Sequence, residues 1–146
     1  MHVIEFTVEG RPAPKGSYSP MSRKSLRTGR TVTFLRPMSK YEHPWRKTIV
    51  KQIKKEHIID DYGTLEVPLL VCLEFRLKRP KSVSILQRLF PIVKPDIDKI
   101  TRATFDALTD SGLIKDDSYI TQMMVKKRYD DHEPEGVTIM LMEDKR

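Results

Sequence analysis

One nearly unbroken run of apolar residues, at positions 67–77, constrains the fold of this chain more than any other feature. The run is too short to cross a membrane as a helix, which needs roughly 18 consecutive apolar residues. Its last positions alternate between apolar and polar residues, a pattern typical of a strand. We therefore expect a β-sheet with residues 67–77 as its central strand and no membrane-spanning segment.

Three further segments have the pattern of strands. Residues 3–9 alternate loosely, are rich in β-branched side chains and stop at Gly10. Residues 120–129 and 137–142 flank a polar stretch at 130–136. This arrangement predicts two antiparallel strands joined by a turn.

Two segments have the apolar periodicity of amphipathic helices, and we expect them at 44–57 and 99–110. Asp98 is a suitable N-cap for the second helix, and Gly112 is a suitable C-cap. A third, short helix is predicted at 84–89. The apolar faces of the two main helices consist of Trp45, Ile49, Ile53, Ile100, Ala103, Thr104, Ala107 and Leu108.

A chain of 146 residues has the size of one domain, and no internal repeat divides it. The pattern of elements predicts an α/β fold of the α+β type, in which a mixed sheet is flanked by the two main helices. The start of the chain has no basic patch ahead of a long apolar stretch, so it does not resemble a secretory signal. We expect a cytoplasmic protein.

Positive charge is concentrated in one part of the chain. The net charge is +7, and residues 11–40 include eight basic residues but no acidic ones. This stretch reads as a long loop with a short hairpin around Thr28 and Gly29. It is either a phosphate-binding surface or a solvated loop that keeps the protein soluble. Its basic residues are Arg11, Lys15, Arg23, Lys24, Arg27, Arg30, Arg36 and Lys40.

The predicted helix at 44–57 has a second basic surface. Its polar side could contact DNA, but such a side is more often only the solvent face of an amphipathic helix. The residues of this side are Arg46, Lys47, Lys51, Lys54 and Lys55.

Several kinds of site are excluded. Cys72 is the only cysteine and stands in the apolar run, so no disulfide within the chain is possible and a core position is expected. A zinc site is not expected, because the histidines do not have the spacing of zinc ligands. The sequence also has no glycine-rich phosphate loop and no nucleophile motif. The histidines are His2, His43, His57 and His132.

Asp96, Asp98 and Asp117 are the candidate metal ligands. Hydrolysis of a phosphodiester needs an activated water and neutralised phosphate charge, and divalent ions held by carboxylates supply both. Asp96 and Asp98 stand where the chain turns into a predicted helix, so both carboxylates could bind one metal ion. Asp117 follows after one helix, which spans roughly 18 Å, and can join them only if the 111–116 connection runs back along it.

Arg102 stands four residues after Asp98, on the same side of the predicted helix. It either contacts the scissile phosphate or forms an ordinary helical ion pair with Asp98. The residues alone leave this open.

The order of these motifs resembles the RusA family of Holliday junction resolvases. The resemblance covers both ends of the domain, and its specificity comes mainly from residues 94–117. The matching stretches are Phe6-Thr7-Val8-Glu9-Gly10-Arg11-Pro12-Ala13-Pro14-Lys15-Gly16, Lys94-Pro95-Asp96-Ile97-Asp98, Phe105-Asp106-Ala107-Leu108, Gly112 and Asp116-Asp117.

The resemblance implies a homodimer, encoded by a bacterium or phage, that cuts four-way DNA junctions by paired nicks in recombination and repair. It implies Mg²⁺, with Mn²⁺ as a substitute, held by Asp96, Asp98 and Asp117, and no small-molecule cofactor. The role of Asp116 stays open between a neighbour that tunes the site electrostatically, which we favour, and a direct ligand. The expected DNA contacts are Lys15, Arg23, Lys24, Arg27, Arg30 and Lys94.

Two positions depart from the family's usual pattern. The family has Asn directly after the second aspartate and Lys four residues after it, whereas this chain has Lys99 and Arg102. Lys99 is therefore a candidate for the catalytic lysine's role. Three alternatives remain: an inactive branched-DNA-binding protein on the same fold, a nuclease for flaps or forks, and a structural or protein-binding role.

Overall fold

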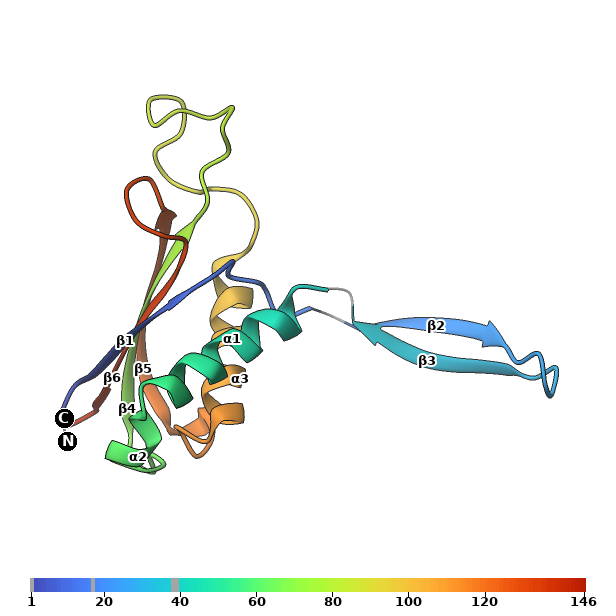
Figure 1. Cartoon of the computed structure of the whole chain (residues 1–146), viewed down its shortest axis with the longest axis horizontal. Coiled ribbons are helices and arrows are strands. Elements are labelled where there is room, and N and C mark those ends of the chain that lie inside the picture. Colours follow the sequence, from blue (N-terminus) through green and yellow to red (C-terminus); the bar gives the residue numbers. More distant parts are fainter. Residues whose placement is uncertain (1, 17, 38–39) are drawn as a thin grey trace.

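In the computed structural model, which describes residues 2–16, 18–37 and 40–146, the body consists of a four-stranded mixed sheet and three α-helices. Helices α1 and α3 lie on the same side of the sheet (Figure 1). This confirms the expected mixed fold of the α+β type. The elements are β1 (Ile4–Glu9), β2 (Tyr18–Lys24), β3 (Thr31–Pro37), α1 (Glu42–Lys55), α2 (Ile58–Tyr62), β4 (Leu69–Leu77), α3 (Ile97–Ser111), the 3-10 helix η1 (Asp117–Tyr119), β5 (Ile120–Tyr129) and β6 (Gly136–Glu143).

Strand β4 is central in the sheet, as its apolar composition predicts. It pairs in parallel with β5 and antiparallel with β6. Leu69, Val71 and Leu73 are buried in the core, whereas the residues between them are half-buried. Cys72 is one of these intermediate residues, so the expectation that it belongs to the core is wrong.

The last two strands are antiparallel and joined by a turn, as predicted, but they are not neighbours in the sheet. β5 and β6 run in opposite directions but are not hydrogen-bonded to each other, because β4 lies between them in the order β1-β6-β4-β5. Burial explains this order, since the most apolar strand gains most from the sheltered central position. The turn that follows β5 therefore spans a neighbouring strand instead of closing a hairpin.

The two main helices are confirmed, with different starting points. α1 begins at Glu42 and buries Trp45, Ile49 and Ile53 against the core. α3 begins at Ile97, and Asp96 occupies the N-cap position that was predicted for Asp98. The apolar face predicted for the second helix is buried, and Gly112 ends α3 in the left-handed region with φ of 81°.

The basic segment forms a long hairpin where a loop with only a short hairpin was expected. β2 and β3 pair from Tyr18↔Pro37 to Lys24↔Thr31. Backbone bonds between Ser25 and Arg30 close the tip. Figure 1 shows that this hairpin projects away from the sheet and helices. The side chain of Arg36 lies outside the described part of the structure.

The short helix predicted at 84–89 is wrong. Residues 78–95 form a connection without a helix, which we call the proline loop because Pro80, Pro91 and Pro95 lie in it. It extends beyond the end of the sheet (Figure 1). Across the described residues, none of the helices combines the length and apolar character that a membrane span requires.

Gly136 opens β6 at a place where a side chain does not fit. Its φ is +155°, and a Cβ added there would lie 2.1 Å from the backbone oxygen of Val8. Because β1 and β6 would have to separate, we expect Gly136→Ala to lower the free energy of unfolding by about 2–4 kcal/mol in denaturant titrations.

Gly63→Ala is the matched control for this substitution. Its φ is also positive, at +69°, but no described atom lies within 4 Å of an added Cβ. We expect a loss of about 1 kcal/mol, the cost of the left-handed backbone alone. Equal losses for the two variants would contradict the steric explanation.

Candidate active site and nucleic-acid interface

Asp96 and Asp98 lie at the exposed N-terminal end of α3. Asp96 is the N-cap, with an extended backbone, and Asp98 is in the first turn. The partial positive charge at a helix N-terminus favours carboxylates in both positions. The fold therefore places two hard oxygen ligands, separated by one residue, at the surface.

Lys127 supports the segment that leads into these acids. It lies on β5, and its Nζ donates to the carbonyl oxygens of Val93 at 2.8 Å and Pro95 at 2.9 Å. These bonds tie the end of the proline loop to the sheet directly before Asp96. Sequence reasoning missed this residue, because a lysine in an alternating strand usually indicates a solvent-facing position.

Lys99 and Arg102 both lie near these acids on α3. The Nζ of Lys99 is 3.5 Å from an oxygen of Asp96, and both side chains are about half-exposed. Arg102 is exposed, and neither it nor Asp98 has a side-chain partner among the residues that the structure describes. The helical ion pair between Asp98 and Arg102 is therefore absent, which leaves Arg102 available to a phosphate.

Asp117 lies at the other end of α3. It begins η1, and its Oδ1 accepts a hydrogen bond of 2.5 Å from Thr109, in the last turn of α3. Asp116 precedes it and accepts from the backbone N–H of Ser118, and the hydrogen bonds from Ser118 lower the pKa of Asp116. Asp116 thus caps the short helix that presents Asp117.

Within one copy of the chain the three acids do not meet. Thr109 lies eleven residues after Asp98, which corresponds to about 16 Å along a helix. The described residues include no group of three His, Cys, Asp or Glu side chains that could hold a metal ion. The carboxylates are the right ligands for Mg²⁺ in kind, but one copy does not assemble all three.

The N-terminal segment is fastened to α3. The backbone N–H of Lys15 donates to the carbonyl of Lys99 at 2.9 Å, and its Nζ is 2.9 Å from a carboxylate oxygen of Asp106. Gly16 donates to the carboxylate of Glu42 on α1. Lys15, which we predicted as a DNA contact, therefore already has an acidic partner.

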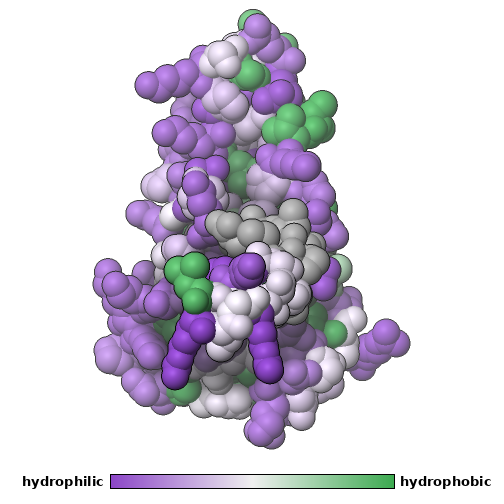
Figure 2. All heavy atoms as spheres, turned by 90° about the vertical axis from the view of Figure 1, so that its right-hand side faces the viewer, coloured by the Kyte–Doolittle hydropathy of each residue, from purple (hydrophilic) through white to green (hydrophobic). Residues whose placement is uncertain are grey.

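The hairpin displays four of the predicted DNA-contact residues near its tip, all of them exposed: Arg23, Lys24, Arg27 and Arg30. Figure 2 looks along the hairpin toward the body, and hydrophilic side chains dominate this face. An arm of one charge sign that stands clear of the body is suited to contact a polyanion.

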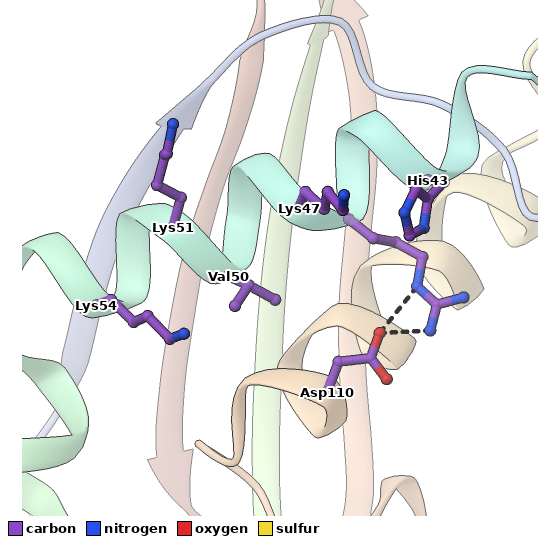
Figure 3. A pocket seen from close by; sticks show the side chains of 7 residues that line it. His43, Lys47, Val50, Lys51, Lys54 and Asp110 are labelled. Atoms are coloured by element: carbon purple, nitrogen blue, oxygen red, sulfur yellow. Dashed lines mark hydrogen bonds and ion pairs between the residues drawn. The ribbon is translucent and has the colours of Figure 1, made fainter.

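The basic side of α1 lines a shallow groove of about 420 Å³ beside α3. Figure 3 shows Lys47, Lys51 and Lys54 along this side. The Arg46 guanidinium donates to the carboxylate of Asp110 on α3. Arg46 is therefore engaged within the fold. The lysines fit both interpretations of this helix, a DNA contact or a solvent face.

For the junction cleavage that the sequence resemblance implies, we expect Lys127→Met to lower the rate about tenfold, because the backbone that carries the candidate ligand Asp96 loses its support. Single-turnover cleavage and junction binding, measured in parallel, check this, and binding should not change. Lys126→Met is the matched control, since that amine pairs with Glu74 at 2.9 Å. Equal slowing in both variants would contradict a positioning role.

A comparison with protein families gives one match that covers most of the chain. The family model described as endodeoxyribonuclease RusA matches residues 14–142. The match includes the hairpin, the proline loop, α3 and η1, and so contains all the acids discussed above. No curated protein matches the chain.

Proposed function

Because the chain belongs to the endodeoxyribonuclease RusA family, we propose that it is a magnesium-dependent, structure-selective endonuclease that resolves four-way DNA junctions. In this proposal it makes paired, symmetric nicks on opposing strands during recombination and repair. The observation that carries the proposal is the exposed Asp96 and Asp98 at the start of α3, with the unpaired Arg102 one turn further on.

The residues of this end of α3 have separate roles in the proposal. Mg²⁺, or Mn²⁺ in its place, neutralises phosphate charge and activates a water when it is bound to the acids. Arg102 binds the scissile phosphate. Lys99 adds a second positive charge beside Asp96 and stands in for the lysine that the family has at the position of Arg102.

We propose that the protein acts as a homodimer, and the separation of the acids supports this. If two copies place their α3 helices antiparallel about a two-fold axis, Asp96 and Asp98 of one copy approach Asp117 of the other. Each pair of copies would then have two complete sites, which matches the approximate two-fold symmetry of a junction.

The experiment is a titration of the purified protein on a labelled four-way junction, with linear duplex and flap controls, with and without Mg²⁺, at two salt concentrations. Paired, metal-dependent nicks on the junction alone are the expected result. Preferential nicking of the flap would favour a flap or fork nuclease. Junction binding without nicks would favour the inactive DNA-binding protein, and no salt-sensitive binding would favour a structural or protein-binding role.

Lys99→Ala tests whether Lys99 takes part in catalysis. We expect a cleavage rate lowered about a hundredfold, the lower end of what one general acid–base or charge-stabilising group contributes. Junction affinity should change little, because one phosphate contact is a small part of the interface. An unchanged single-turnover rate would remove Lys99 from the mechanism.

A further inference from the structure

A basic pocket lies beside the candidate active site. It has a volume of about 530 Å³ and is enclosed by the proline loop, the ends of β4 and β5, and the N-terminal segment at Arg11 and Pro12. Lys94 and Pro95 line it, and Asp96 follows them directly in the chain. A ligand in this pocket would therefore lie next to the acids.

The wall of the pocket is held in place by Arg79. Its guanidinium donates to the backbone carbonyls of Ser84, Arg88 and Leu89, and to Asp131 at 2.6 Å. It also stacks over the ring of Tyr129, 4.0 Å from the ring centroid. The proline loop is thus built around one partly buried cation, so the pocket exists before any ligand arrives.

The rim of the pocket is positive and its charges are unpaired. Lys78, Lys81 and Lys94 line it and are exposed, and within the described parts of the chain no acidic side chain pairs with them. One acid, Glu135, is also in the lining. Three unpaired lysines around one opening indicate an anionic ligand.

The inner walls are apolar, unlike the rim. Pro12, Leu77 and Pro91 are buried and line the pocket, together with the buried ring of Tyr129. An apolar interior with a cationic rim suits a nucleotide, whose base prefers apolar and aromatic surfaces and whose phosphates prefer lysine. The volume lies in the range of ordinary ligand pockets and accommodates one nucleotide.

Apolar side chains point to solvent on the same loop. Leu86, Phe90 and Ile92 are 98%, 64% and 81% exposed. Figure 2 shows hydrophobic atoms in the upper part of this face, at the height that the proline loop has in Figure 1. Proteins that unstack DNA commonly insert such side chains between bases.

We propose that this pocket receives one unstacked nucleotide of the substrate strand, next to the phosphate that is cut, while Phe90 or Ile92 fills the space that the base leaves. The proposal rests on the proposed function and deepens it. Unstacking a base costs a few kcal/mol in a linear duplex and least where pairing is already broken. A branch point supplies such a nucleotide, so the pocket makes the enzyme selective for branched DNA.

The test uses the whole protein in EDTA and four-way junctions with 2-aminopurine at one position at a time around the branch point. This base fluoresces when it leaves the stack. We expect a severalfold rise for one position in each strand that is cut, and no rise with a linear duplex of the same sequence. Val93→Trp, which fills the pocket from a half-exposed position, should abolish the rise while the hairpin still binds the junction.

Lys78→Ala with Lys81→Ala tests the rim. Loss of two contacts to single-stranded phosphates should reduce the slope of log affinity against log salt by about 1.4. Lys145→Ala with Arg146→Ala removes the same charge near the C-terminus, which lies at the opposite end of the sheet from the proline loop, and should leave the slope unchanged (Figure 1).

Each outcome decides between the two proposals. Junction binding by the unaltered protein without a fluorescence rise at any position would overturn the pocket and leave the proposed function standing. A fluorescence rise that persists in Val93→Trp would also overturn the pocket proposal. The same holds if Val93→Trp changes the oligomeric state of the protein and leaves the fluorescence rise as it was. Failure of the unaltered protein to bind any junction would reject the proposed function, and the pocket with it.

Discussion

Asp98→Asn and Asp117→Asn are each expected to reduce junction cleavage by more than about a hundredfold, because loss of a direct metal ligand should cost at least as much as loss of a supporting residue. Junction affinity should be unchanged or higher, since each substitution removes a negative charge that would face phosphate in the proposed complex. Cleavage time courses at saturating Mg²⁺, with binding measured in EDTA, check both expectations.

Glu5→Gln is the matched control for these substitutions. Glu5 is an exposed acid on β1, which forms the opposite edge of the sheet from β5, the strand that follows Asp117. It should change neither cleavage nor binding. If Asp98→Asn and Asp117→Asn lost junction binding as strongly as cleavage, the acids would be structural and the proposed site would be wrong.

The same variants test the dimeric arrangement of the acids. A mixed dimer contains one Asp98→Asn copy and one Asp117→Asn copy. If each site takes acids from both copies, one of the two sites keeps all its acids and the other has both substitutions. The mixture should therefore recover single nicks, although neither variant cuts alone. If each site belonged to one copy, no mixture would recover activity, and the proposed antiparallel arrangement of α3 would be rejected.

We expect junction binding to weaken about a thousandfold at physiological salt when the four basic residues near the hairpin tip are replaced by glutamine. These residues are Arg23, Lys24, Arg27 and Arg30. The reason is electrostatic, because four lost duplex phosphate contacts reduce the salt slope by about 3.6. Affinities at several salt concentrations give this slope directly. An unchanged slope would mean that the hairpin does not contact DNA.

The unfolding midpoint of this variant should match that of the unaltered protein. The hairpin contributes no residue to the core cluster of the described chain. An isolated two-stranded hairpin is only marginally stable in water, so a binding partner would stabilise its ordered form. A two-stranded ribbon fits the major groove of duplex DNA, which is the contact that we expect for one arm of the junction.

Replacement of the α1 lysines tests whether the basic side of this helix contacts DNA, a question that the sequence left open. Removal of Lys47, Lys51 and Lys54 subtracts three charges from one exposed helix face. A smaller slope would identify this face as a second DNA contact. An unchanged slope would identify it as the solvent side of an amphipathic helix.

The sequence by itself determined the elements whose signals are local. The apolar run of β4 and the apolar spacing of α1 and α3 are encoded within single segments, so their positions agree with the prediction to within two residues. The metal-ligand candidates and the family were also evident, because they depend on residue types and their order.

Only the tertiary structure decided which distant segments meet. β4 separates β5 from β6 because burial of the whole sheet, and not chain proximity, sets strand order. Lys127 reaches carbonyls more than thirty residues away, at Val93 and Pro95. Arg79, at the start of the proline loop, pairs with Asp131, 52 residues further along the chain. Each of these contacts joins residues far apart in sequence, and no local periodicity records such a pairing.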